Sequence, residues 1–214
     1  MGKDSNLDIP KDADVSAEVS EGVVVSEVND EIDDSYNKYM KNDNAKEFEY
    51  KSAEEKETER QTDLRNCPIE GNDGNWEGGE NERGESKWIP EPDEIPSKSN
   101  PNNLTWDEIL DKCDIDGVEF HGGEPDFSEV TKEAVKINDF TDARSDNFDQ
   151  ADEILAKRWN NVPESVADWR KENNYTWHEC RDCETMQLVP SEVHNNITHR
   201  GGVSQAKEGV LENE

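Results

Sequence analysis

The spacing of apolar residues changes near residue 104. Before this point apolar side chains are sparse and follow no regular period, whereas beyond it they recur at intervals typical of helices and strands. Thr105 and Glu108 form a capping-box pattern directly ahead of the apolar Ile109. This pattern predicts a short helix over about residues 106–113.

Two further helices are predicted in the middle of this region. Apolar residues recur at helical spacing from Phe148 to Trp159, which predicts an amphipathic helix over about residues 147–159. Pro163 suits the first turn of another helix, and the Asn173–Asn174 pair is expected to end it.

Strand-like segments surround these helices. The segments GVEFHGGEPDFSEV and EAVKINDF alternate in the manner of strands and are separated by Gly and Pro. Within residues 175–199 the order is a strand (YTWHEC), a turn (RDCE), a second strand (TMQLV) stopped by Pro190, and one or two helical turns (SEVHNNITH). The predicted fold class is α+β, a small C-terminal domain containing a ββα hairpin.

The first hundred residues predict less structure. Residues 1–70 are interpreted as a largely disordered acidic region with an exposed helix over residues 44–64, where helix formers outnumber apolar residues. Residues 71–103 are rich in Gly and Pro, and their two Trp residues indicate an ordered but irregular lead-in. The predicted domain therefore covers residues 104–214.

Composition limits the choice of function. Hydrophobic residues make up 30% of the chain, charged residues 36%, and the formal net charge is −31. This acidity counts against binding to nucleic acid, although a divalent cation could offset it locally. There is neither an apolar run long enough to span a bilayer nor a secretory signal, so we expect a soluble protein that does not act on membranes.

The histidines carry the clearest chemical pattern. His178 falls at the end of a predicted strand, while His194 and His199 flank the helix that follows. A ββα hairpin folds this helix back onto the strand end, so three imidazoles can converge on one metal ion and leave a coordination position open. Glu179 stands beside them and could deprotonate water for attack on a phosphate.

A longer stretch, YTWHECRDCETMQLVPSEVHNNITHRGG, resembles a known group of nucleases. It is similar to the WHH-type nucleases of the HNH/endonuclease VII superfamily, which occur at the C-termini of bacterial polymorphic toxins. The residues that carry the resemblance are Trp177, His178, Glu179, Met186 to Pro190, His194, His199, Gly201 and Gly202. Upstream, GEPDFSEVTKEAVKI and RSDNFDQADEILA extend it over roughly residues 104–207.

The resemblance implies roles for these residues. Glu179 occupies the position of the second His of the family motif, so His178 becomes a metal ligand and Glu179 the general base; in the other register His178 is the base and Glu179 a ligand or an orienting residue. The Asn of the HNH motif has no clear counterpart, and Glu184 or Thr185 falls nearest. Arg200 is predicted to contact phosphate.

The resemblance also implies a biological role. The expected activity is metal-dependent cleavage of phosphodiester bonds, in DNA rather than RNA, with Mg²⁺, Mn²⁺ or Zn²⁺. The implied setting is a toxin or effector that is delivered to a target cell, acts in its cytoplasm and is neutralised by an immunity protein.

One alternative uses part of the same segment. Cys180-x2-Cys183-x10-His194-x4-His199 is close to the spacing of a Cys2His2 zinc finger, which predicts a non-enzymatic binding module stabilised by zinc. This interpretation leaves His178 and Glu179 without a function.

Overall fold

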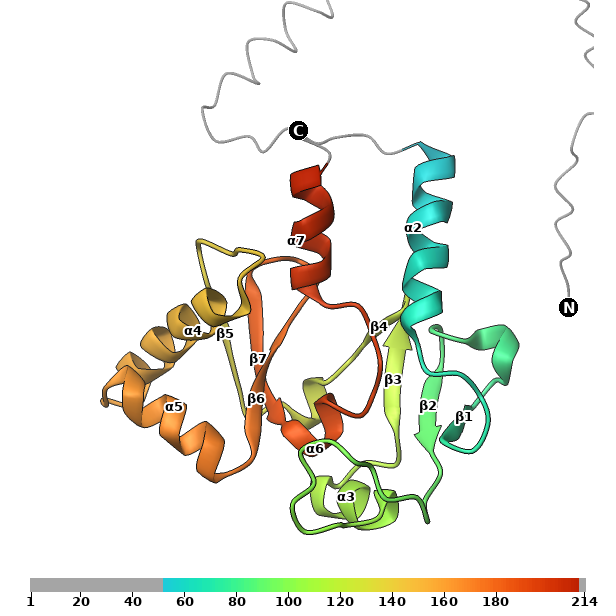
Figure 1. The fold of residues 1–214 in the computed structure, drawn as a ribbon, viewed down its shortest axis with the longest axis horizontal. Coiled ribbons are helices and arrows are strands. Elements are labelled where there is room, and N and C mark those ends of the chain that lie inside the picture. Colours follow the sequence, from blue (N-terminus) through green and yellow to red (C-terminus); the bar gives the residue numbers. More distant parts are fainter. Residues whose placement is uncertain (1–51, 212–214) are drawn as a thin grey trace, which may run out of the picture. The chain divides into compact units, whose positions relative to one another are not determined.

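The computed structural model describes residues 52–211 (Figure 1). The predicted disorder of residues 1–51 and the start of the predicted 44–64 helix lie outside this range. The helices are α2 (Ala53–Asn66), α3 (Trp106–Cys113), α4 (Arg144–Arg158), α5 (Pro163–Glu172), α6 (Ser191–His194) and α7 (Gly202–Leu211), with 3-10 turns η1 (Glu80–Glu82) and η2 (Ser128–Val130). The strands are β1 (Gly74–Trp76), β2 (Lys87–Pro90), β3 (Val118–His121), β4 (Glu124–Pro125), β5 (Glu133–Lys136), β6 (Tyr175–Glu179) and β7 (Thr185–Pro190).

These elements form a mixed α+β fold with two antiparallel sheets. One sheet has the strand order β1-β2-β3-β4, and the other has the order β5-β7-β6. In the second sheet Trp177 pairs with Leu188 and His178 with Gln187, which fixes the register of the β6–β7 hairpin. The helix α6 begins directly after β7, so the predicted order of strand, turn, strand and helix is confirmed.

The predicted helices of the middle region are also confirmed. The Thr105 hydroxyl accepts a hydrogen bond from the Glu108 backbone N–H, and the Glu108 carboxylate accepts one from the Thr105 backbone N–H, so the capping box begins α3 as expected. Pro163 occupies the first turn of α5, and the positive φ of Asn174 turns the chain into β6. The predicted 147–159 helix is α4, which begins at Arg144.

The segment predicted as an irregular lead-in contains two short strands. β1 pairs with β2, and β2 pairs with β3. Trp76 and Trp88 are buried here, with their ring centroids 5.2 Å apart, and Trp76 also packs edge-on against Phe120. Strands of three and four residues are too short to show an alternating pattern, so burial of the two tryptophans organises them instead.

Two hydrophobic clusters meet at the β6–β7–α6 segment. One contains Trp76, Trp88 and residues of α3 and β3, and it takes in Val189, Val193 and Ile197. The other contains Trp177, Met186 and Leu188 together with apolar residues of α4 and α5, and Figure 1 shows these two helices beside the β5-β7-β6 sheet. The β6–β7–α6 segment is therefore supported from both sides.

The helix α2 is tied to the rest of the fold by buried charges. Asp63 is 2% exposed and accepts hydrogen bonds from Arg181 and Arg200. Arg200 also pairs with Glu208 of α7. A guanidinium that is buried and shared by two carboxylates links α2 to α7, so the structure gives Arg200, the residue predicted to contact phosphate, a structural role.

Within residues 52–211 no helix is both long and apolar enough to cross a membrane.

Candidate metal and hydrolytic site

The first histidine of the site is fixed by strand β6. Successive side chains of a strand point to opposite faces, so His178 lies on one face while Trp177 and Glu179 lie on the other. His178 is 1% exposed and packs edge-on against Phe127, with ring centroids 4.9 Å apart. Phe127 also contacts the rings of His194 and His199, so it forms an apolar support beneath all three imidazoles.

The other two histidines are oriented by hydrogen bonds at Nδ1. The Nδ1 atom of His194, the last residue of α6, lies 3.0 Å from the side-chain oxygen of Asn195, and that of His199 lies 2.8 Å from the carbonyl oxygen of Ile197. Both partners are acceptors, so each neutral ring carries its proton on Nδ1. Nε2 is then the atom of each ring that can bind a metal, and Nε2 of His194 lies 3.2 Å from His178 Nδ1.

The three imidazoles converge. Their ring centroids lie 5.1 to 5.2 Å apart, and one nitrogen from each ring lies within 4.8 Å of the others. His178 Nδ1 is 3.2 Å from His194 Nε2. Two nitrogens that bind one tetrahedral ion at ordinary bond lengths are separated by about 3.4 Å. The spacing thus fits a shared divalent cation, and the three predicted ligands are brought together.

All three rings are held in the neutral form that a metal requires. Burial is the main cause in each case, and it lowers the pKa of His178 well below its usual value, that of His194 to about 3 and that of His199 to about 4. The neighbouring His199 adds to the lowering for His178 and His194. The site therefore presents lone pairs at neutral pH.

Glu179 is enclosed by two partners on the opposite face of β6. Its side chain is 3% exposed; one carboxylate oxygen accepts from Arg144 Nε at 2.9 Å and the other from Asn147 Nδ2 at 2.9 Å. Both partners belong to the first turns of α4. No local sequence pattern indicates these two contacts, because Arg144 and Asn147 lie 35 and 32 positions before Glu179.

A cavity of about 460 Å³ joins the two faces at the end of β6, and its lining includes His178, Glu179, His194, His199 and Arg144. Lys98 and Lys207 also line it, and of the residues described there Glu179 alone is acidic. Arg200 is not in this lining. The cavity therefore combines convergent imidazoles with a cationic rim, in a chain whose formal net charge is −31.

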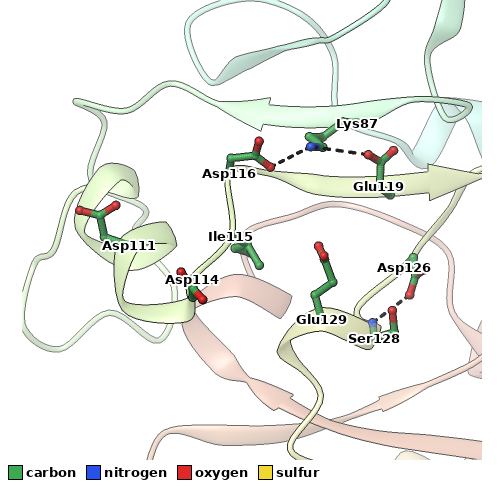
Figure 2. Close-up of a pocket in the computed structure, with 9 residues that line it drawn as sticks. All are labelled: Lys87, Asp111, Asp114, Ile115, Asp116, Glu119, Asp126, Ser128 and Glu129. Atoms are coloured by element: carbon green, nitrogen blue, oxygen red, sulfur yellow. Dashed lines mark hydrogen bonds and ion pairs between the residues drawn. The ribbon is translucent and has the colours of Figure 1, made fainter.

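A different cavity shows the opposite character. Figure 2 shows this cavity of about 600 Å³, in which Lys87 pairs with Asp116 at 2.8 Å and with Glu119 at 3.7 Å. Its other charged lining residues are all carboxylates, namely Asp111, Asp114, Asp126 and Glu129. This surface repels phosphate, so the histidine cavity is the better candidate for a phosphodiester.

The zinc-finger alternative is not supported by the geometry. That motif requires Cys180 and Cys183 to join His194 and His199 around one ion. Among the described residues, the two groups with metal-binding spacing are His178–His194–His199 and Glu124–His178–Cys180, and neither contains Cys183.

Residues 116–201 match a known family. The matching family model is the DNase/tRNase domain of colicin-like bacteriocins. The matched range runs from the start of β3 past α6, and it includes the three histidines, Glu179 and Arg144. The match supports a toxin nuclease domain in this part of the chain. A search of curated proteins finds no match.

Proposed function

We propose that this chain is a metal-dependent endonuclease of the HNH type, acting on DNA. The observation that carries the proposal is the convergence of three buried, neutral imidazoles on one point beside a cationic cavity. The similarity to a DNase/tRNase family supports a nucleic acid substrate. The order of β6, β7 and α6, with ligands at the strand end and around the helix, is the arrangement expected for a ββα-metal nuclease.

His178, His194 and His199 would hold the cation. The fit rests on the 3.2 Å spacing of two ring nitrogens and on the two Nδ1 hydrogen bonds that orient Nε2. Three nitrogen ligands leave a coordination position open, as in catalytic sites. When bound, Mg²⁺, Mn²⁺ or Zn²⁺ would polarise the scissile phosphate and stabilise the leaving oxygen.

Glu179 is proposed as the general base. Each of its oxygens accepts one hydrogen bond, from Arg144 or from Asn147, and each keeps a second lone pair. The carboxylate is therefore held in one orientation at the cavity wall, where it can take a proton from an attacking water molecule. The two hydrogen bonds supply the orientation that the missing Asn of the HNH motif would otherwise provide.

Arg144 is proposed as the phosphate contact. Its Nε is engaged by Glu179, yet its side chain is 63% exposed and lines the cavity. The remaining guanidinium nitrogens can then donate to phosphate oxygens. Lys98 and Lys207 extend the cationic rim, so nucleic acid is attracted locally although the chain as a whole is acidic.

The biological setting is proposed from the resemblance to toxin nucleases. A toxin nuclease would be delivered to a target cell, act in its cytoplasm and be neutralised by an immunity protein in the cell that makes it. These roles are proposals that rest on the similarity to colicin-like bacteriocin domains.

The decisive experiment is a cleavage assay on the purified full chain. The metal-stripped protein is incubated with plasmid DNA or with tRNA, alone and with added Mg²⁺, Mn²⁺ or Zn²⁺. We expect DNA cleavage that needs added metal, is lost in His194→Ala and persists in His121→Ala, which alters an exposed histidine outside the triad. Metal-independent cleavage, or none with any cation, would contradict the proposal, and cleavage of tRNA alone would reassign the substrate.

The role of Glu179 needs a separate test. Glu179→Gln keeps an acceptor oxygen but cannot take a proton, so kcat should fall by about 10²-fold or more while metal affinity is unchanged. Arg144→Ala should mainly raise KM for DNA. If Glu179→Gln retained the pH profile and rate of the wild type, His178 would become the candidate base.

A further inference from the structure

A second group of potential metal ligands includes His178 but neither of the other two histidines of the triad. We propose that Glu124, His178 and Cys180 form a distinct binding site for a thiophilic divalent cation such as Zn²⁺ or Cd²⁺, and that its occupation withdraws His178 from the histidine triad. Binding at this site stands on its own geometry, whereas its effect on cleavage rests on the proposed function.

Three different ligand atoms are already gathered at this point. A carboxylate oxygen of Glu124, a ring nitrogen of His178 and the sulfur of Cys180 lie within 4.8 Å of one another. Cys180 follows His178 by two positions, directly after β6 ends at Glu179, and its N–H donates to the Thr185 carbonyl at 3.0 Å, so the extended hairpin places both side chains on the same face. Glu124 comes from β4, where one carboxylate oxygen accepts from the Arg181 backbone at 2.8 Å; the other accepts no hydrogen bond from the residues that the structure describes.

One ring nitrogen of His178 lacks a hydrogen-bond partner among the described residues. His178 Nδ1 faces His194, so its Nε2 is directed away from that ring. This Nε2 is buried and has no hydrogen-bond partner in the structure. A buried polar atom without a hydrogen-bond partner destabilises the fold. A cation between Nε2, Glu124 and Cys180 would remove that destabilisation.

The surroundings provide both access and attraction. A cavity of about 300 Å³ is lined by Glu124 and Cys180, and also by His121, Asp126 and Asp182. Its carboxylates attract cations, and its open side leaves room for a water molecule as the fourth ligand. Sulfur, nitrogen and oxygen donors together are typical of zinc sites, and the thiol would release its proton to solvent on binding.

The two sites compete because they share one imidazole. A neutral histidine has a single lone pair, so His178 can serve the triad through Nδ1 or the Cys180 set through Nε2, but not both. A triad reduced to His194 and His199 binds its cation more weakly. Excess zinc should therefore inhibit the nuclease through Cys180.

Cd²⁺ titration of the full chain tests binding, because thiolate–cadmium bonds absorb in the ultraviolet. We expect this absorption in the wild type, in His194→Ala, which removes a triad ligand, and in Cys183→Ser, which alters the other cysteine of the same turn. It should be lost in Cys180→Ser and weakened at least 10-fold in affinity in Glu124→Gln. Equal absorption in Cys180→Ser and the wild type, or none in either, would overturn the proposal.

Cleavage under rising Zn²⁺, with Mn²⁺ or Mg²⁺ supporting activity, tests the competition. Cys180→Ser should keep the basal rate and resist inhibition, whereas Cys183→Ser should be inhibited like the wild type. If cadmium binds through Cys180 and yet zinc inhibits all three proteins equally, the two sites do not compete and the switching role is wrong. Absence of cleavage in every protein would contradict the proposed function and would leave the binding result standing.

Discussion

The buried polar side chains on the two faces of strand β6 differ in how completely they are hydrogen-bonded. On the face toward α4 and α5, Trp177 Nε1 donates to Asp152 at 2.8 Å, and Glu179 accepts from Arg144 and Asn147. On the other face, His178 contacts two further imidazoles and has a buried nitrogen without a partner. Neighbouring residues of one strand thus belong to a saturated network and to an unsaturated one.

This difference distinguishes hydrogen-bonded side chains that stabilise the fold from imidazoles that are candidates for binding a ligand. Buried polar atoms are almost always hydrogen-bonded, so the network of Trp177, Asp152 and Arg170 needs no function beyond stability. The clustering of three buried imidazoles, one nitrogen of each within 4.8 Å of the others, has no such explanation among the described residues. Substitutions of Asp152 and Trp177 should therefore change stability, while substitutions of the three histidines or of Glu179, which lines the same cavity, should change metal binding or cleavage.

The largest effect on stability is expected at Asp152. Its carboxylate is 3% exposed and accepts from Arg170 Nε at 2.8 Å as well as from Trp177. Asp152→Asn leaves the guanidinium of Arg170 buried without a counter-charge, which should lower the free energy of unfolding by about 3 kcal/mol. Urea denaturation measures this change.

The matched control is Asp168→Asn on α5. Asp168 pairs with Lys171 at the surface, and both side chains are at least 70% exposed, so the loss should stay below about 1 kcal/mol. Equal losses in the two variants would contradict the distinction between the faces, as would loss of metal affinity in folded Asp152→Asn protein.

The histidines should make the stability of the metal-free protein depend on pH. In the metal-free protein the pKa values of His194 and His199 are lowered to about 3 and about 4, below the ordinary value of 6.5. As the pH falls, the histidines therefore bind protons in the unfolded chain before they do so in the folded protein. Their contribution to the free energy of unfolding is complete above pH 6.5 and is lost as the pH falls toward 4. Between pH 6.5 and 5 most carboxylates remain ionised and the histidines dominate the slope.

Chemical denaturation of metal-free protein at several pH values measures that slope. His194→Asn removes one of the groups with a lowered pKa. It should therefore reduce the slope of unfolding free energy against pH by the equivalent of up to one bound proton. A wild-type stability that stayed constant from pH 6.5 to 5 would show that the imidazoles are solvated rather than buried, and the contrast between the two faces would fail.

Much of this site could be predicted from sequence because its parts lie close together. His178 lies near the end of the first strand of the hairpin, His194 ends the short helix α6, and His199 lies in the irregular segment just after it, so the three are separated by only 21 positions along the chain. Local rules also predicted α3 and α5, since a capping box and an N-terminal Pro act within one turn.

Interactions between distant residues were not predictable in this way. The partners of Glu179 lie 35 and 32 positions earlier, and Arg200 reaches Asp63 across 137 positions. Arg200 is buried and pairs with Asp63, whereas Arg144 is more exposed and lies at the cavity. Both stand among polar residues in the sequence, so local composition does not distinguish their roles. Charge pairing over such distances depends on tertiary packing, which no local pattern encodes.

The smallest expected effect is at Trp177, and it gives the sharpest test of whether the two faces are independent. Trp177→Phe removes the Nε1–H donor, but Asp152 keeps its bonds to Arg170, so no buried charge loses its counter-ion. The loss should be about 1 kcal/mol, from one hydrogen bond and a small volume change. Because Trp177 directly precedes His178, any transmission through the strand should appear here first. Metal affinity measured by calorimetry should match the wild type, and a tenfold weakening would show that packing on the saturated face positions the triad as well.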